Sequence, residues 1–83
     1  MPTSSKPPLS EATAAFGRRV RAQREELGLT QEGLADIVEL HWTFVGQVER
    51  GRRNISLHNI LKLAAGLKID PGELVRGLTP TLD

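Results

Sequence analysis

The sequence predicts an all-α fold, a compact domain of five short helices. Three observations predict it. Apolar residues recur at three- and four-residue steps along most of the chain. No segment alternates between apolar and polar residues as a half-buried strand would. Helix-capping residues and helix-ending glycines follow one another at short intervals. With 83 residues, 39% hydrophobic and 25% charged, the chain has the size and composition of one globular domain.

The first predicted helix follows a proline-containing segment. Residues 1–9 combine prolines with serine and threonine and predict a flexible N-terminal arm. Ser10 is a good N-cap, and Glu11 suits the positive end of the helix dipole. The helix then runs to Gly28, which ends it. Its inward stripe comprises Ala12, Phe16, Val20, Gln23 and Leu27.

The second and third helices are separated by a short turn. Thr30 caps the second helix, QEGLADIVE, whose Gly33 lowers helix propensity by up to about 1 kcal/mol relative to alanine. The third begins near Trp42 and stops at Gly51. The expected inward residues are Leu34, Ala35 and Val38 on the second helix, and Val45 and Val48 on the third.

Two further helices complete the domain, which we place at residues 10–78 with a C-terminal tail at 79–83. Ser56 caps LHNILKLAAGLK. Asp70, Pro71 and Glu73 supply an N-cap, an N1 proline and an N3 carboxylate for a capping box. We expect the fifth helix to run for about two turns and to end at Gly77. The inward face predicted for the fourth helix comprises Leu57, Ile60, Leu61 and Ala64.

Helix geometry divides the third helix into two sides. At about 100° per residue, Thr43, Gln47 and Arg50 point outward, and Glu49 falls beside the inward valines. A carboxylate there needs a partner. Arg24, at the edge of the first helix's apolar stripe, is the candidate, and we predict a partly buried ion pair between the two. The alternative is two unrelated surface charges.

Charge and composition narrow the function. The formal net charge is only +1, but the basic residues gather in two groups, Arg18 to Arg24 and Arg50 to Arg53, which predicts a local basic surface. No catalytic pattern is present, and His41 and His58 lack companions at metal-ligand spacing, so we expect neither an enzyme, a metal nor a cofactor. Without cysteine or a long apolar run, we expect a soluble cytoplasmic protein with no membrane partner.

The run LGLTQEGLADIVELHWTFVGQVERG resembles the helix-turn-helix of the Cro and phage-repressor type, also called the xenobiotic response element (XRE) family. The matching positions are Thr30, Gln31, Ala35, Val45, Val48, Glu49 and Gly51. The resemblance extends from about Ser10 to Leu78, and LKIDPGELV is similar to the family's entry to its fifth helix. It implies a lambda-repressor-like fold. Within the family, the short chain is similar to controller proteins of restriction-modification systems and to small phage repressors.

Four positions depart from the family pattern. Glu39 replaces a glycine in the turn, where a left-handed residue is favoured, so we expect strain there. His41 replaces the serine or threonine that usually caps the recognition helix, and is a weaker cap. Gly33 replaces a frequent glutamate, and Lys68 a frequent glycine. Together they predict moderate stability.

The resemblance implies a sequence-specific DNA-binding transcriptional regulator with its third helix in the major groove. The base-reading residues are expected to be Gln31, Trp42, Thr43 and Gln47. The phosphate contacts are expected to be Arg50, Arg52, Arg53, Asn54 and Ser56. Trp42 could instead be core, Phe44 is assigned mainly to packing, and a basic loop can be mere solvated surface. Arg18 and Arg21 stay open between DNA contact and surface.

A single recognition helix contacts few bases, so a homodimer on a palindromic operator is expected. The interface residues predicted are Leu67, Ile69, Leu74, Val75 and Leu78, which could alternatively only complete the monomer core. RNA polymerase is a further candidate partner. The competing hypothesis for function is an antitoxin-like or adaptor protein whose main role is binding another protein.

Overall fold

The computed structural model describes residues 6–80 and contains five helices and no strand in that range. The helices are α1 (Glu11–Glu26), α2 (Gln31–Val38), α3 (Trp42–Glu49), α4 (Leu57–Leu67) and α5 (Pro71–Val75). The predicted all-α class is therefore confirmed. Residues 1–5 of the predicted arm and 81–83 of the predicted tail lie outside the described residues. Within the described range, no helix is long and apolar enough to cross a membrane.

Side-chain caps fix where the helices begin. The side chains of Ser10, Thr30, Ser56 and Asp70 each accept a backbone N–H from the first turn of the helix that follows. The capping box predicted at α5 does not form, because the Glu73 carboxylate pairs with Arg76 instead. A capping box joins Ser10 and Thr13 at the start of α1. Helix α5 is also shorter than expected, since the chain leaves helical geometry at Arg76.

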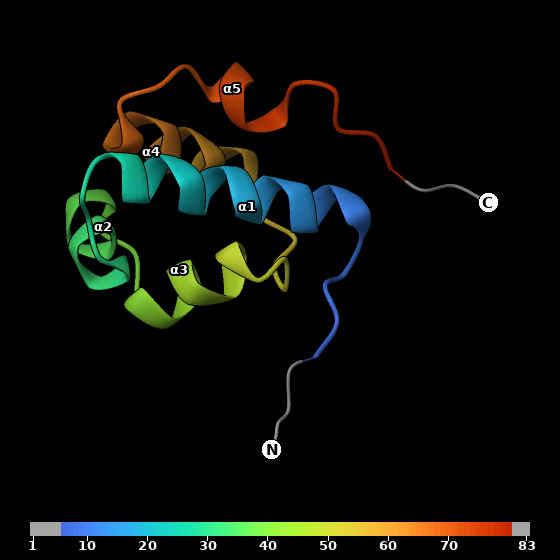
Figure 1. Ribbon diagram of the computed structural model, residues 1–83, viewed down its shortest axis with the longest axis horizontal. Coiled ribbons are helices and arrows are strands. Elements are labelled where there is room, and N and C mark those ends of the chain that lie inside the picture. Colours follow the sequence, from blue (N-terminus) through green and yellow to red (C-terminus); the bar gives the residue numbers. More distant parts are fainter. Residues whose placement is uncertain (1–5, 81–83) are drawn as a thin grey trace.

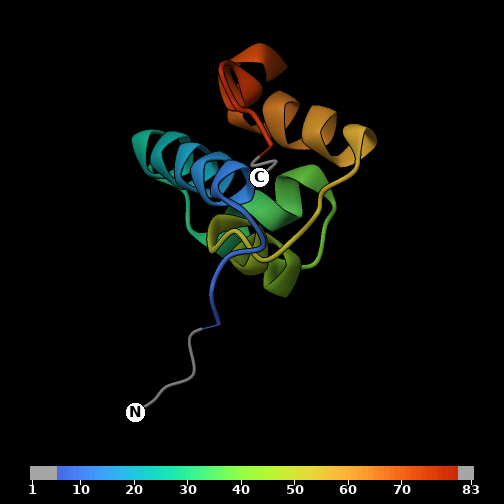
Figure 2. The same cartoon turned by 90° about the vertical axis from the view of Figure 1, so that its right-hand side faces the viewer.

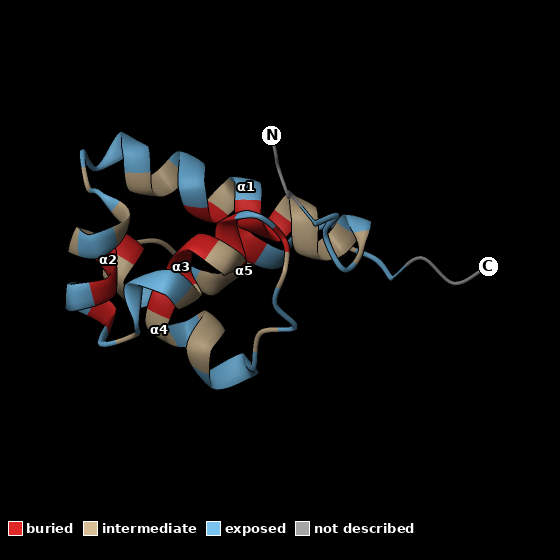
Figure 3. Ribbon diagram, turned by 90° about the horizontal axis from the view of Figure 1, so that it is seen from below, coloured by how far each residue is buried: buried red, intermediate tan, exposed pale blue. Residues whose placement is uncertain are grey.

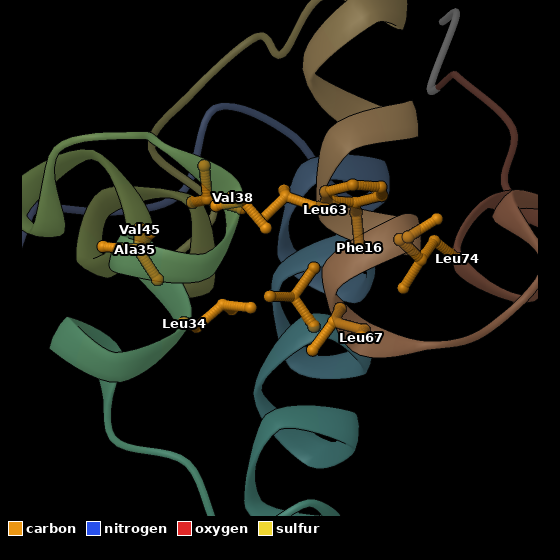
Figure 4. Packing of buried hydrophobic residues seen from close by; sticks show 11 residues of the cluster. Phe16, Leu34, Ala35, Val38, Val45, Leu63, Leu67 and Leu74 are labelled. Carbon is orange, nitrogen blue, oxygen red and sulfur yellow. The ribbon is translucent and has the colours of Figure 1, made fainter.

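The other four helices are arranged around α1, the longest of the five. In Figures 1 and 2, α3 lies below α1 while α4 and α5 lie above it, and α2 closes one end. Buried apolar side chains from all five helices meet between these layers (Figure 4). They are Phe16, Val20, Leu34, Ala35, Val38, Val45, Val48, Leu63, Ala64, Leu67 and Leu74. The inward residues predicted for α2 and α3 are therefore confirmed.

The inward faces predicted for α1 and α4 were partly wrong. Leu27, Leu57 and Leu61 are 37%, 71% and 45% exposed. Helix α4 is rotated so that Leu63 and Leu67, four residues apart, face the core. Gly66 allows that rotation, because a Cβ at this position would collide with the side chain of Val38 on α2. Helix α4 thus leaves two leucines on its outer face.

Two of the residues predicted for a dimer interface belong instead to the monomer core. Leu67 and Leu74 have no exposed surface. Helix α5 is too short to cover the core with a broad face, and it closes the core by inserting Leu74. Ile69 and Leu78 pack partly buried against the same cluster. Only Val75, which is 40% exposed, is largely available to a partner.

Polar side chains of α1 hold the upper helices in place. Nη1 of Arg19 donates to the carbonyls of Leu74 (3.2 Å) and Arg76 (2.8 Å). The Gln23 amide donates to the Leu67 carbonyl at 3.1 Å. Carbonyls at helix C-termini have no partner within the helix, so these side chains supply donors that α4 and α5 lack.

Gly17 of α1 lies directly against the backbone at the end of α3, which makes it a sensitive position. A Cβ at Gly17 would lie 2.6 Å from the Glu49 carbonyl oxygen and closer still to that of Val48. We expect Gly17→Ala to lower the free energy of unfolding by about 3 kcal/mol, because backbone atoms cannot swing aside. Urea unfolding followed by circular dichroism measures it.

Gly33→Ala is the matched control. A Cβ there meets only the Thr30 hydroxyl at 3.2 Å and a Leu29 methyl at 3.8 Å. Its gain in helix propensity keeps the expected change within about 1 kcal/mol. Equal losses from the two substitutions would refute the close-approach explanation.

Candidate nucleic-acid interface

Helices α2 and α3 are joined by a tight turn that places α3 on the lower surface of the molecule. Glu39 ends α2 in the left-handed conformation, with φ at 59°. A non-glycine residue there costs about 1–2 kcal/mol. The Leu40 N–H donates to the Ala35 carbonyl and closes the turn. Figure 3, which views the molecule from below, shows that α3 carries both buried and exposed positions.

A buried carboxylate sets which side of α3 faces inward. Glu49 Oε2 accepts from Arg24 Nε at 2.6 Å, and Glu49 Oε1 accepts from Arg24 Nη2 at 3.0 Å. The two side chains are only 3% and 11% exposed. The ion pair expected between them is present and bidentate. The hydrogen bond with Glu49 raises the pKa of Arg24 against the opposing effect of burial.

Gln31 joins this ion pair. Its Nε2 donates to Glu49 Oε1 at 3.0 Å, while Arg24 Nη1 donates to the Leu29 carbonyl at 2.8 Å. Gln31, expected to contact DNA, is therefore turned toward the junction of α1, α2 and α3. Its Oε1 lies beside Gly46, where a Cβ would be 3.3 Å away.

The leading end of α3 is capped by a histidine. The Thr43 N–H donates to Nδ1 of His41 at 3.2 Å, so this nitrogen carries no proton in the capped state. The Thr43 hydroxyl lies 2.7 Å from the same atom. The His41 ring stacks on Trp42 with centroids 6.1 Å apart. Trp42 is 49% exposed, so the core alternative for this residue was wrong.

The trailing end of α3 is a Schellman motif. Gly51 has a φ of 76°, its N–H donates to the Val48 carbonyl, and the Arg52 N–H donates to the Gln47 carbonyl. The chain then folds back, and Arg53 Nε donates to Gln47 Oε1 at 2.6 Å.

Phe44 and Arg53 also meet on this side of α3. The Arg53 guanidinium carbon lies 5.1 Å from the centroid of the Phe44 ring. Phe44 itself packs against the core, as expected. The ring is therefore both a core residue and a platform for the arginine.

The segment before α1 is fastened to the same loop. Arg52 Nη1 donates to the Pro7 carbonyl at 2.6 Å, and the Leu9 N–H donates to the Gly51 carbonyl at 2.8 Å. The Thr13 hydroxyl donates to the same Gly51 oxygen at 2.9 Å. Residues 7–9, predicted as part of a flexible arm, are therefore hydrogen-bonded to the loop after α3.

The remaining basic candidates differ in their surroundings. Arg50, Asn54 and Ser56 are exposed near the end of α3 and the start of α4. Arg18 is exposed as well, and Arg21 pairs with Glu25 at 3.1 Å on the surface. Within residues 6–80, no three His, Asp or Glu side chains come together as a metal site.

The structure thus brings together several of the residues that were predicted to contact DNA. Trp42, Thr43 and Arg50 are exposed on α3, and Gln47 is half-buried beside Arg53. The contacts of Gln31, Arg52 and Arg53 with other protein groups were not predicted, because their partners come from distant segments or folded-back loops.

Comparison with known proteins places this geometry among regulators. A family model described as helix-turn-helix matches residues 20–74. Control protein C.BamHI of Bacillus amyloliquefaciens is 41% identical over 61 residues, covering 72% of this chain and 75% of that protein. Control protein C.MunI of Mycoplasma sp is 36% identical over 67 residues, covering 80% of this chain and 90% of that protein.

Solved structures agree. The restriction-modification controller protein C.AhdI from Aeromonas hydrophila superposes with a TM-score of 0.73 at 53% identity, over 75% of this chain and 94% of that one. The P22 c2 repressor, in complex with a synthetic operator, gives 0.70 at 31% identity, also over 75% and 94%. Both share the arrangement described here.

The ion pair lends itself to a stability test. Arg24→Ala leaves the Glu49 carboxylate buried without its cation, so we expect a loss of about 3–5 kcal/mol in the free energy of unfolding. Glu49→Gln should lose a similar amount. In a double-mutant cycle, the double variant should lose clearly less than the sum of the two. The exposed pair Arg21 and Glu25 is the control, with a coupling of about 0.5 kcal/mol. Additive losses at Arg24 and Glu49 would contradict the pairing.

Proposed function

The chain belongs to the helix-turn-helix family, and from that premise we propose that it is a sequence-specific transcriptional regulator that binds a palindromic DNA operator as a homodimer. One observation carries the proposal. Burial of Glu49 forces the opposite side of α3 outward, and that side bears Thr43 and Gln47 directly before an arginine-rich loop. Residues 10–78 form the DNA-binding domain in this proposal.

Base recognition falls to the leading half of α3, which enters the major groove. The Thr43 methyl can contact thymine, and its hydroxyl can bond several bases. Gln47 offers an amide. Trp42, exposed and braced by His41, can pack on a thymine methyl or a sugar. Gln31 supports α3 from its inward side, because its amide donates to Glu49 and lies beside Gly46.

Phosphate contacts fall to the loop after α3 and the start of α4. Arg50, Asn54 and Ser56 are exposed there, and Ser56 stands at the N-terminus of α4, where backbone N–H groups favour an anion. Arg52 and Arg53 each have one donor engaged within the protein, and a guanidinium has five, so both can also bind phosphate. Such contacts hold register and make binding salt-dependent.

The dimer interface is assigned to the outer apolar residues of the upper helices. Val75 is exposed on α5, with Ile69 and Leu78 partly buried nearby in sequence. Leu57 and Leu61, four residues apart on α4, add exposed apolar surface that the sequence interpretation had placed in the core. Helices α4 and α5, which carry Leu57, Leu61 and Val75, lie above α1 in Figure 1, and α3 lies below it.

The relatives point to a regulatory setting. Those named control proteins match most of this chain, and C.AhdI is named a restriction-modification controller. We propose the same role for this protein, acting through its concentration on promoter DNA without a cofactor. RNA polymerase, bound at the same promoter, is a candidate partner. Genes for a methyltransferase and an endonuclease beside its own would support this role, and a toxin gene would favour the antitoxin alternative.

Base reading can be tested on an operator selected from a randomised duplex library. Thr43→Ala and Gln47→Ala should each weaken binding to the selected operator about tenfold, as expected when one base contact is lost, and leave binding to unrelated DNA almost unchanged. Fluorescence anisotropy at fixed salt measures both. Arg50→Ala is the control: it should weaken both DNAs alike and reduce the salt slope by about one. Unchanged selectivity in both alanine variants would remove these residues from the reading face.

Dimerisation can be tested by introducing one charged side chain into the proposed interface. Val75→Glu should produce monomers in analytical ultracentrifugation, because a buried unpaired carboxylate opposes association. Operator affinity should then fall about a hundredfold as the two half-sites lose their linkage. Ile37→Glu, at a side chain 54% exposed on α2, is the control and should stay dimeric. A dimeric Val75→Glu would reject this interface, and a monomeric parent protein would reject the homodimer.

A further inference from the structure

The exposed side chain of Arg53 makes two contacts that hold it against α3. Its Nε donates to Gln47 Oε1 at 2.6 Å, and its guanidinium carbon lies 5.1 Å from the centre of the Phe44 ring. Phe44 and Gln47 are three residues apart, so they are neighbours on the helix surface. The arginine therefore bridges two positions that lie about one turn apart on the same side of the proposed reading helix.

The backbone fixes the position of Arg53 relative to Gln47. The Schellman motif at Gly51 turns the chain back, and the Arg52 N–H is held by the carbonyl of Gln47 itself. The next residue is Arg53, whose side chain can then reach the Gln47 amide. Phe44 is partly buried against the core, and its ring lies beside the Arg53 guanidinium.

The chemistry of the pair determines how the amide is oriented. A guanidinium has only donors, so the amide atom facing Arg53 must be the oxygen of Gln47. Its nitrogen, with two protons, is then the atom left for another partner. We propose that Arg53 is a positioning residue that orients Gln47 to present its NH₂ group to DNA and thereby to select guanine.

This inference rests on the proposed function, and it changes the base that Gln47 would read. A free glutamine pairs with adenine by using its oxygen and its nitrogen together. Here the oxygen already accepts one hydrogen bond from Arg53 and lies beside its positive charge, which disfavours the approach of an amino group from adenine or cytosine. Guanine offers two acceptors, N7 and O6, and no donor at that edge of the major groove. The remaining Arg53 nitrogens stay available for phosphate.

The test combines DNA selection with a measurement on the free protein. The operator selected from a randomised duplex library should contain guanine at one position per half-site that Gln47→Ala makes indifferent. Replacing that guanine with adenine should weaken binding to the parent protein about tenfold. In Arg53→Lys, which keeps the charge but lacks the planar Nε–H donor, this preference should fall to threefold or less while other positions keep theirs. Arg50→Lys is the matched control and should retain the preference.

The side-chain amide of Gln47 gives a readout that needs no DNA. Its ¹⁵N–¹H resonances should shift in Arg53→Lys and Arg53→Ala but stay in place in Arg50→Lys. Resonances unmoved by either Arg53 variant would overturn the contact. Equal weakening by Arg53→Lys on guanine and adenine operators would reduce Arg53 to a phosphate contact and also overturn the proposal. Absence of any selected sequence for the parent protein would instead overturn the proposed function, while the amide measurement would still decide the contact.

Discussion

The arrangement of the lower half of the molecule depends on one buried carboxylate. Glu49 is nearly inaccessible to water, and such a group is tolerable only when donors surround it. Arg24 of α1 and Gln31 of α2 supply those donors, so three helices meet at one side chain of α3. The pair need not add net stability to fix orientation. Any rotation of α3 about its axis would leave a charge buried and unpaired, so the outward side of the helix is determined from within.

Local features of the fold could be read from the sequence because they depend on residues close together in the chain. The caps at Ser10, Thr30 and Ser56 and the left-handed end at Gly51 each involve a few neighbouring residues. The face of α4 could not be read so surely. Its leucines occupy more than one stripe, and the close packing of Gly66 against Val38 that accompanies the buried stripe is a contact between distant segments.

In the candidate site, too, some contacts could be predicted from the sequence and others depend on the folded chain. Helix geometry alone placed Glu49 inward, and Arg24 was the cation able to reach it. The loop arginines were harder, since a sequence shows their charge but not the carbonyl or amide each one meets. Arg52 meets Pro7 and Arg53 meets Gln47, contacts set by the course of the folded chain. The role of Arg19 could not be predicted for the same reason, because the carbonyls that it contacts lie more than fifty residues away in the sequence.

The contacts of His41 and Arg53 have one feature in common: each holds a side chain of the proposed reading side of α3 in place within the protein itself. His41 caps the helix and holds Thr43, and Arg53 holds Gln47. Side chains already ordered lose less entropy on binding, so more of the contact energy is available for discrimination between bases. The left-handed conformation of Glu39 has a structural role, because this residue forms the turn that sets the angle of α3. Its backbone strain is confined to that turn. Under the proposed function, a relative with the same residues on the reading side but a different residue in place of Arg53 would favour a different operator. Under that function, specificity depends on the residues that support the proposed reading side as well as on those that form it.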